Sequence, residues 1–140
     1  MAANLKFSHL PGLYGIVRMA ADESVPVWAT HGGFTSVTRS AEELSIVCCA
    51  DNFPPEFAAG PRWICLKLEG PFPFSQTGVL LSFIEPLSNN GVPIFAISTF
   101  DTDYVLVQEE FQRATQKLLA DAGHEFIAIS GESEGKREQS

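Results

Sequence analysis

The order of apolar patterns between residues 63 and 129 constrains the fold of this chain more than any other feature. Six segments there have the period of either a strand or a helix, and they lie at 63–68, 80–87, 93–99, 104–107, 111–122 and 125–129. We expect strand, helix, strand, strand, helix and strand in that order. A β-α-β-β-α-β unit closes a four-stranded antiparallel sheet with both helices packed on one face, which is a ferredoxin-like α+β fold.

Local signals predict where the two helices begin and end. Thr77 is an N-cap candidate for the first helix, Pro86 lies in its last turn, and Asn90-Gly91 provides left-handed C-cap chemistry. The acidic run 108–110 suits the first turn of the second helix, and Gly123 ends it. The apolar stripe of the second helix is expected to consist of Phe111, Ala114, Leu118 and Ala122.

The N-terminal half has a less regular pattern. Strand candidates lie at 13–19, 34–38 and 44–49, and 26–30 is long enough for only a single helical turn. Prolines and glycines between residues 54 and 61 then mark a boundary.

We interpret this organisation as two related units and a tail. Residues 1–61 form a shortened version of the sheet unit with eroded helices, and residues 62–130 form the complete unit. Residues 131–140 include no core-forming side chain, and we expect them to be disordered.

Composition limits the classes of partner. The net charge of −8, without a cluster of Lys and Arg, argues against nucleic-acid binding. No apolar run approaches the roughly 18 residues of a membrane span, and the N-terminus does not have the pattern of a signal peptide. Three cysteines, of which Cys48 and Cys49 are adjacent, do not form a disulfide framework. We therefore expect a cytoplasmic protein that contacts neither nucleic acid nor a membrane.

Patterns typical of enzymes are weak in this chain. His9, His31 and His124 are far apart and do not have the spacing of metal ligands. Cys48 is followed by Cys49 rather than by a redox Cys-x-x-Cys pattern, so buried structural thiols are the better interpretation. We predict no catalytic residues, no metal site and no cofactor.

Three segments carry a resemblance to a known family. Residues 78–87, 91–100 and 103–107 resemble an ACT domain of the aspartokinase-type subgroup and of the CASTOR-type cytosolic arginine sensors. The most specific part is Ile97-Ser98-Thr99-Phe100-x-x-Asp103, and residues 34–47 resemble the first of two tandem ACT units. The resemblance implies a small stand-alone bacterial-type regulatory protein of two tandem ACT units, with an amino acid as its ligand.

A ligand site follows from the resemblance and from charge. The resemblance places Thr99, Phe100 and Asp103 on a ligand-facing segment and 77–79 on the loop opposite. Free N–H groups at the helix start suit a carboxylate, and Asp101 with Asp103 suits an ammonium or a cationic ligand such as arginine or lysine. The predicted ligand-binding residues are Thr77, Gly78, Val79, Ser98, Thr99, Phe100, Asp101 and Asp103.

Each of these residues also has a structural interpretation. Thr77 and Gly78 are typical helix-start residues, Asp101 and Asp103 are typical turn formers, and Phe100 is a candidate core residue. Two functions therefore remain open, namely an amino-acid sensor without catalytic activity and a structural dimerisation module of ACT fold that has lost its ligand. An open sheet edge favours a homodimer in either case.

Overall fold

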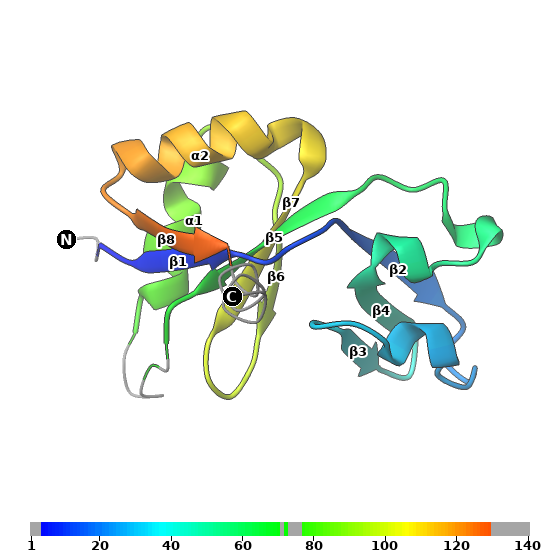
Figure 1. The fold of residues 1–140 in the computed structure, drawn as a ribbon. Coiled ribbons are helices and arrows are strands. Elements are labelled where there is room, and N and C mark those ends of the chain that lie inside the picture. The colour runs from blue at the N-terminus through cyan, green and yellow to red at the C-terminus, as the bar shows by residue number, and fades with distance from the viewer. Residues whose placement is uncertain (1–3, 71, 73–76, 130–140) are drawn as a thin grey trace, which may run out of the picture. The chain divides into compact units, whose positions relative to one another are not determined.

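The protein folds into two compact units in this computed structural model, which describes residues 4–70, 72 and 77–129. Unit 1 comprises residues 1–11 and 64–140, and unit 2 comprises residues 12–63 (Figure 1). The expected units were 1–61 and 62–130. The observed division differs in that residues 1–11 belong with the C-terminal unit. The expected disordered tail, 131–140, lies outside the described residues.

Unit 1 is a mixed α+β fold. Its described elements are β1 (Lys6–His9), β5 (Trp63–Leu68, with Trp63 itself assigned to unit 2), α1 (Val79–Ser88), β6 (Phe95–Ser98), β7 (Asp103–Gln108), α2 (Gln112–Asp121) and β8 (Glu125–Ile129). The strands are ordered β8-β1-β5-β7-β6. The sequence of elements from β5 to β8 is the β-α-β-β-α-β order that the periodicity predicts.

The sheet of unit 1 includes β1 in addition to the four strands that were expected. Strand β1 lies between β5 and β8, antiparallel to β5 and parallel to β8, with Phe7 opposite both Leu68 and Phe126. A bulge between Phe7 and Ser8 shifts the register with β8. Four residues are too few for a periodic signal, so sequence reasoning missed this strand.

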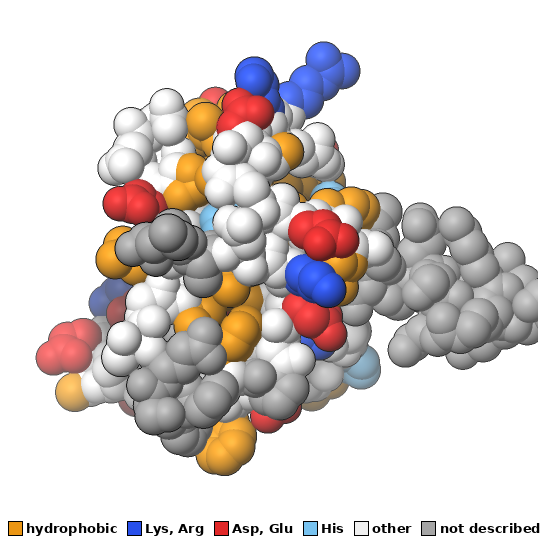
Figure 2. All heavy atoms as spheres, turned by 90° about the vertical axis from the view of Figure 1, so that its left-hand side faces the viewer, with side chains coloured by type: hydrophobic (Ala, Val, Ile, Leu, Met, Phe, Trp, Pro, Cys, Tyr) orange, Lys and Arg blue, Asp and Glu red, His pale blue; other side chains and the backbone are white. Residues whose placement is uncertain are grey.

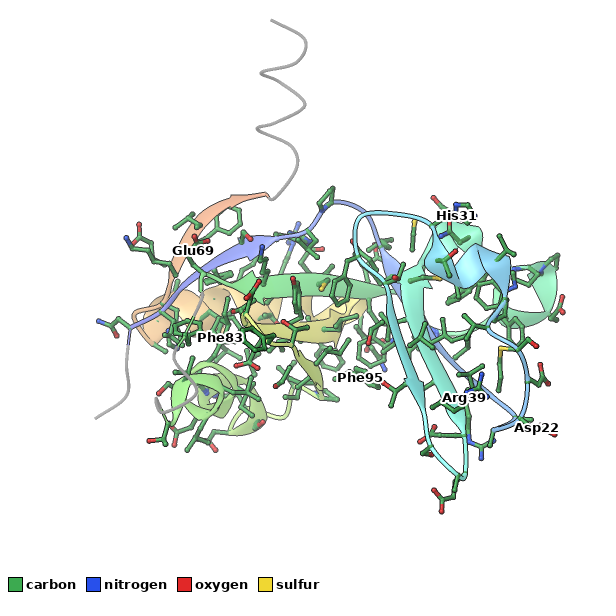
Figure 3. The ribbon with its side chains drawn as sticks, turned by 90° about the horizontal axis from the view of Figure 1, so that it is seen from below. Asp22, His31, Arg39, Glu69, Phe83 and Phe95 are labelled. Carbon is green, nitrogen blue, oxygen red and sulfur yellow. The ribbon has the colours of Figure 1, made fainter. Side chains whose placement is uncertain are left out.

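The start of α1 also differs from the expected one. Gly78, not Thr77, is the N-cap residue, and its φ of 77° is left-handed, a conformation that glycine adopts without strain. The helix buries Phe83 and Leu87 completely, as the spacing predicts. Figure 3 shows Phe83 between α1 and the strands of unit 1.

The apolar face of α2 is rotated from the expected stripe. Thr115 and Leu119 are fully buried, whereas Ala114 and Ala122 are exposed. The acidic residues that were expected in its first turn form a separate 3₁₀ turn at Glu109–Phe111, so α2 begins only at Gln112. The change from 3₁₀ to α geometry alters the angle between successive residues and therefore the face that meets the sheet.

Unit 2 is a small antiparallel sheet with 3₁₀ turns. Its strands β2 (Tyr14–Met19), β4 (Leu44–Cys49) and β3 (Ser36–Arg39) pair in that order. The described residues 12–63 include 3₁₀ turns but no α-helix, so the helices of the six-element order are not seen there. Arg39 donates hydrogen bonds to the carbonyls of Ala21 and Glu23, which fixes the loop that contains Asp22 (Figure 3).

A compact cluster holds unit 2 together. Ala29, Leu44, Ile46 and Cys48 are buried in it, with Trp28 and Phe53 among the partly buried side chains around them. The Trp28 and Phe53 rings meet edge to face, with centroids 5.2 Å apart. In the described part of the chain, no helix has the length and apolar character needed to cross a bilayer.

Candidate functional site

All eight predicted ligand-binding residues lie in unit 1, and five of them belong to the β6–β7 hairpin. Ser98 and Asp103 face each other across the hairpin, and the Ser98 hydroxyl donates to Asp103 Oδ1 at 2.5 Å. The backbone N–H and the hydroxyl of Thr99 both donate to the Thr102 carbonyl, at 2.8 and 3.0 Å. These polar groups close the turn, and Phe100 at its tip is 80% exposed.

The other three predicted residues lie at the start of α1. Thr77 and Gly78 are exposed, and Val79 is buried. A Cβ built on Gly78 would meet no atom of the described residues within 4 Å, so none of those residues crowds the first turn of α1 at this position. The Gly78 carbonyl accepts the first intrahelical hydrogen bond, from Ser82 N–H at 2.9 Å.

The connection that follows β5 lies against the β6–β7 turn. The Thr102 hydroxyl donates to the Leu68 carbonyl at 2.8 Å, and Phe72 N–H donates to the Asp101 carbonyl at 3.2 Å. A Cβ on Gly70 would approach the Asp101 carbonyl oxygen to 2.9 Å, so the two backbones come closer than a side chain would allow. The C-terminal end of β5 and the tip of the hairpin are therefore in contact at one end of the strands of unit 1.

A hollow of about 230 Å³ opens where the end of β5 meets the β6–β7 turn, and we name it the hairpin hollow. Lys67, Glu69, Gly70, Asp101 and Thr102 line it. One ammonium group and two carboxylates thus border the same space. Of the predicted residues, only Asp101 contributes to it.

Sequence reasoning missed the other charged residues of the hairpin hollow. Lys67 and Glu69 alternate along the chain with the buried Leu66 and Leu68, so they point to the opposite face of the sheet. This alternation is a signal that was available in the sequence. What was not available was the contact between the end of β5 and the hairpin.

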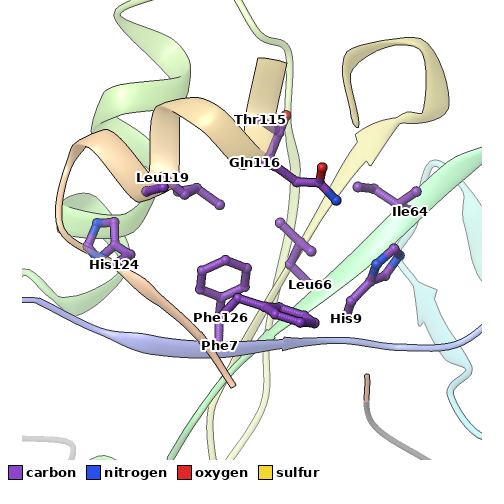
Figure 4. Close-up of a pocket in the computed structure, with 10 residues that line it drawn as sticks. Phe7, His9, Ile64, Leu66, Thr115, Gln116, Leu119, His124 and Phe126 are labelled. Carbon is purple, nitrogen blue, oxygen red and sulfur yellow. The ribbon is translucent and has the colours of Figure 1, made fainter. Parts of the chain in front are cut away.

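A second cavity, of about 220 Å³, lies between α2 and the strands β1, β5 and β8, and we name it the α2 pocket (Figure 4). Its apolar lining consists of Phe7, Ile64, Leu66, Leu119, Ala120 and Phe126. The inserted strand β1 forms one wall of this space, to which it contributes Phe7 and His9.

Polar side chains also border the α2 pocket. Gln116 from α2 and His9 from β1 extend into it from opposite sides (Figure 4). Thr115 is fully buried, and among the described residues its hydroxyl is buried without a hydrogen-bond partner. Burial lowers the pKa of His9 below its ordinary value, which keeps the imidazole neutral at pH 7.

Two of the three cysteines, Cys48 and Cys65, are buried free thiols. Burial raises the pKa of Cys65 to about 12 and that of Cys48 to about 11, so both are protonated at neutral pH. Within the described residues, His, Cys, Asp and Glu side chains do not gather in groups of three or more that could hold a metal ion. On the face drawn in Figure 2, Lys and Arg side chains are few and lie beside acidic ones instead of forming a basic patch.

The family comparisons divide the chain in two. Residues 58–121 match the family model of the ACT domain. Residues 12–56 match a different model, described as an N-terminal domain. The ACT match covers β5 to α2, which includes the hairpin hollow and most of the α2 pocket.

A solved structure shows the relationship more fully. The crystal structure of Atu0741 from Agobacterium tumefaciens shares 48% identity with this chain, covers 91% of it and 95% of its own length, and superposes with a TM-score of 0.85. The chain belongs to the same family as Atu0741.

Two further proteins are similar to this chain at lower sequence identity. VC0802 from Vibrio cholerae, titled a protein of unknown function and possible transport protein, is 18% identical with a TM-score of 0.64 over 89% of this chain and 90% of its own, which shows a shared fold. The bovine cytosolic arginine sensor for mTORC1 subunit 1 is 26% identical over 110 residues. The match covers 71% of this chain but 33% of the sensor, so the chain spans about a third of that protein.

Proposed function

We propose that this chain is a regulatory protein that binds an amino acid and has no catalytic activity of its own. The ACT match and the similarity to an arginine sensor support a small-molecule regulatory role. The observation that carries the proposal is the charge arrangement of the hairpin hollow, in which Lys67 lies beside Glu69 and Asp101.

That arrangement is complementary to a zwitterion. The Lys67 ammonium suits the α-carboxylate of an amino acid, and the carboxylates of Glu69 and Asp101 suit its ammonium. Two carboxylates against one lysine leave an excess of negative charge, which favours a ligand with an additional cationic group. A volume of about 230 Å³ suits a ligand of amino-acid size.

The predicted residues have graded roles in this proposal. Asp101 contacts the ligand, while Ser98, Thr99 and Asp103 hold the hairpin that presents it. Thr77, Gly78 and Val79 contribute the first turn of α1 as a second carboxylate-binding element. Phe100, at the exposed tip, covers the bound ligand.

A thermal-shift screen of the twenty amino acids tests the proposal. A ligand that binds only the native state raises the melting temperature by mass action, and we expect arginine or lysine to do so. Glu69→Gln and Asp101→Asn should each weaken that binding about tenfold. Glu85→Gln, on the exposed face of α1, is the matched control and should leave it unchanged.

The same screen distinguishes the sensor from the alternative, a dimerisation module without a ligand. We propose a homodimer formed at the edge strand β6, which pairs only with β7 among the described strands. Sedimentation equilibrium should give twice the chain mass of 15.2 kDa. A dimer that no amino acid stabilises would mean a structural module, and the sensor proposal would then be abandoned.

A further inference from the structure

The α2 pocket lies on the helix-covered side of the unit 1 sheet, whereas Lys67 and Glu69 of the hairpin hollow point to the opposite face. The two cavities share no lining residue. We propose that the α2 pocket is a separate binding site for a neutral, mainly apolar molecule with one hydroxyl or N–H group, of the class of phenols and indoles.

The size of the pocket sets the size of the ligand. A protein cavity of roughly 150 Å³ lined by Leu, Ile and Phe binds benzene. At about 220 Å³, the α2 pocket is large enough for one aromatic ring with a substituent or a fused second ring.

The lining of the pocket sets the charge of the ligand. The described residues that line it include no Asp, Glu, Lys or Arg. The imidazole of His9 is desolvated and therefore neutral at pH 7. A charged ligand would lose its hydration without gaining an opposite charge, so a neutral molecule is favoured.

The aromatic walls favour a flat ligand. Phe7 meets Phe126 edge to face, with ring centroids 5.8 Å apart, and Phe126 is 52% exposed even though it lines the pocket. An aromatic ligand seated beside Phe126 would remove that apolar surface from water and add a ring contact of the same kind.

Polar side chains of the lining orient the ligand. Thr115 lines the pocket, and its buried hydroxyl has no hydrogen-bond partner among the described residues. The Gln116 amide from α2 and the His9 imidazole from β1 offer donors and acceptors on opposite sides of the pocket (Figure 4). A single hydroxyl or N–H on the ligand satisfies this set better than a purely apolar molecule.

Calorimetric titration of the full chain with phenol, indole and toluene tests the proposal. Phenol and indole should bind with one site per chain, and toluene should bind at least fivefold more weakly. Phenylacetate, a charged aromatic of similar size, should not bind. Absence of phenol and indole binding at millimolar concentration would overturn the proposal, and equal affinity for toluene would overturn the role of the polar groups.

Two alanines of α2 provide matched variants. Ala120→Phe places a ring in the pocket and should weaken indole binding at least tenfold, because Ala120 lines the pocket. Ala114→Phe makes the same change at an exposed position of the same helix outside the lining and should leave binding intact. Equal effects of the two variants would contradict the assignment of the site.

The two proposals fail independently. Asp101→Asn should weaken amino-acid binding and leave indole binding unchanged, while Ala120→Phe should do the reverse. A variant that abolishes both would indicate one coupled site and would overturn the separation argued from the two linings.

Discussion

His124 gives the Ser82 carbonyl a hydrogen bond that Pro86 cannot supply. Ser82 lies four residues before Pro86 in α1, and proline has no N–H to donate to it. His124 Nε2 lies 2.9 Å from the Ser82 oxygen, and Leu5 N–H donates to His124 Nδ1 at 3.1 Å. Because Leu5 N–H can only donate, Nδ1 accepts and Nε2 is the nitrogen that donates to the Ser82 carbonyl.

Replacing His124 should therefore destabilise unit 1. We expect His124→Ala to lower the free energy of unfolding by about 2–3 kcal/mol, since it removes the acceptor of the buried Leu5 N–H and a side-chain partner of the Ser82 carbonyl. Urea denaturation followed by circular dichroism measures the change. His31→Ala, at an exposed histidine of unit 2, is the control and should change stability by less than about 0.5 kcal/mol.

The link with Pro86 can be tested by a double-mutant cycle. Pro86→Ala restores the N–H that α1 lacks, so the Ser82 carbonyl gains an intrahelical donor. In that background, His124→Ala should cost about 1 kcal/mol less than in the native chain. Additive effects of the two substitutions would mean that His124 does not compensate for the proline.

Thr115→Val should stabilise the protein. The substitution replaces a buried hydroxyl without a described partner by a methyl group of similar shape, and valine has a similar helix propensity. We expect the free energy of unfolding to rise by about 1 kcal/mol. Thr115→Ser, which keeps the hydroxyl and removes the methyl group, should lower it by about as much.

Gly15→Ala should destabilise unit 2. A Cβ at this position would lie 1.9 Å from Cε2 of Phe53, so the ring would have to leave its place beside Trp28. We expect a loss of about 1–3 kcal/mol from overpacking. Gly33→Ala is the matched control because a Cβ there meets nothing within 4 Å.

The free energy of unfolding should fall at alkaline pH because the Cys65 thiol ionises more readily in the unfolded chain than in the folded one. Burial raises the pKa of this thiol from about 9 to about 12, so the unfolded chain ionises first as the pH rises. The contribution of the protonated Cys65 thiol to the free energy of unfolding is fully present below pH 9. It is lost between pH 9 and about 12, by up to about 1.4 kcal/mol per pH unit. Urea denaturation in reductant from pH 8 to 10.5 should show a flatter profile for Cys65→Ala, and parallel profiles would contradict the assignment.

The sequence determined which elements form in unit 1 from β5 to β8. The expected strands at 63–68 and 125–129 have the observed bounds, because a strand's period and its turn residues act over a few positions. Helix ends were less accurate, since Thr77 and Gly78 carry similar cap signals and the left-handed backbone at Gly78 selected the latter. The proposed amino-acid site was predicted only through Asp101, while Lys67 and Glu69 required knowledge of which face of β5 meets the hairpin.

Tertiary structure alone decided how distant segments meet. The four residues of β1 carry too little periodicity to be found in isolation, yet their insertion between β5 and β8 adds a strand to the sheet and places Phe7 and His9 in the lining of the α2 pocket. His124 reaches a backbone amide 119 positions away in the chain, and no local pattern encodes that distance. Periodicity and capping act within one or two turns, whereas strand order and cavities depend on which apolar faces pack together once the chain has folded.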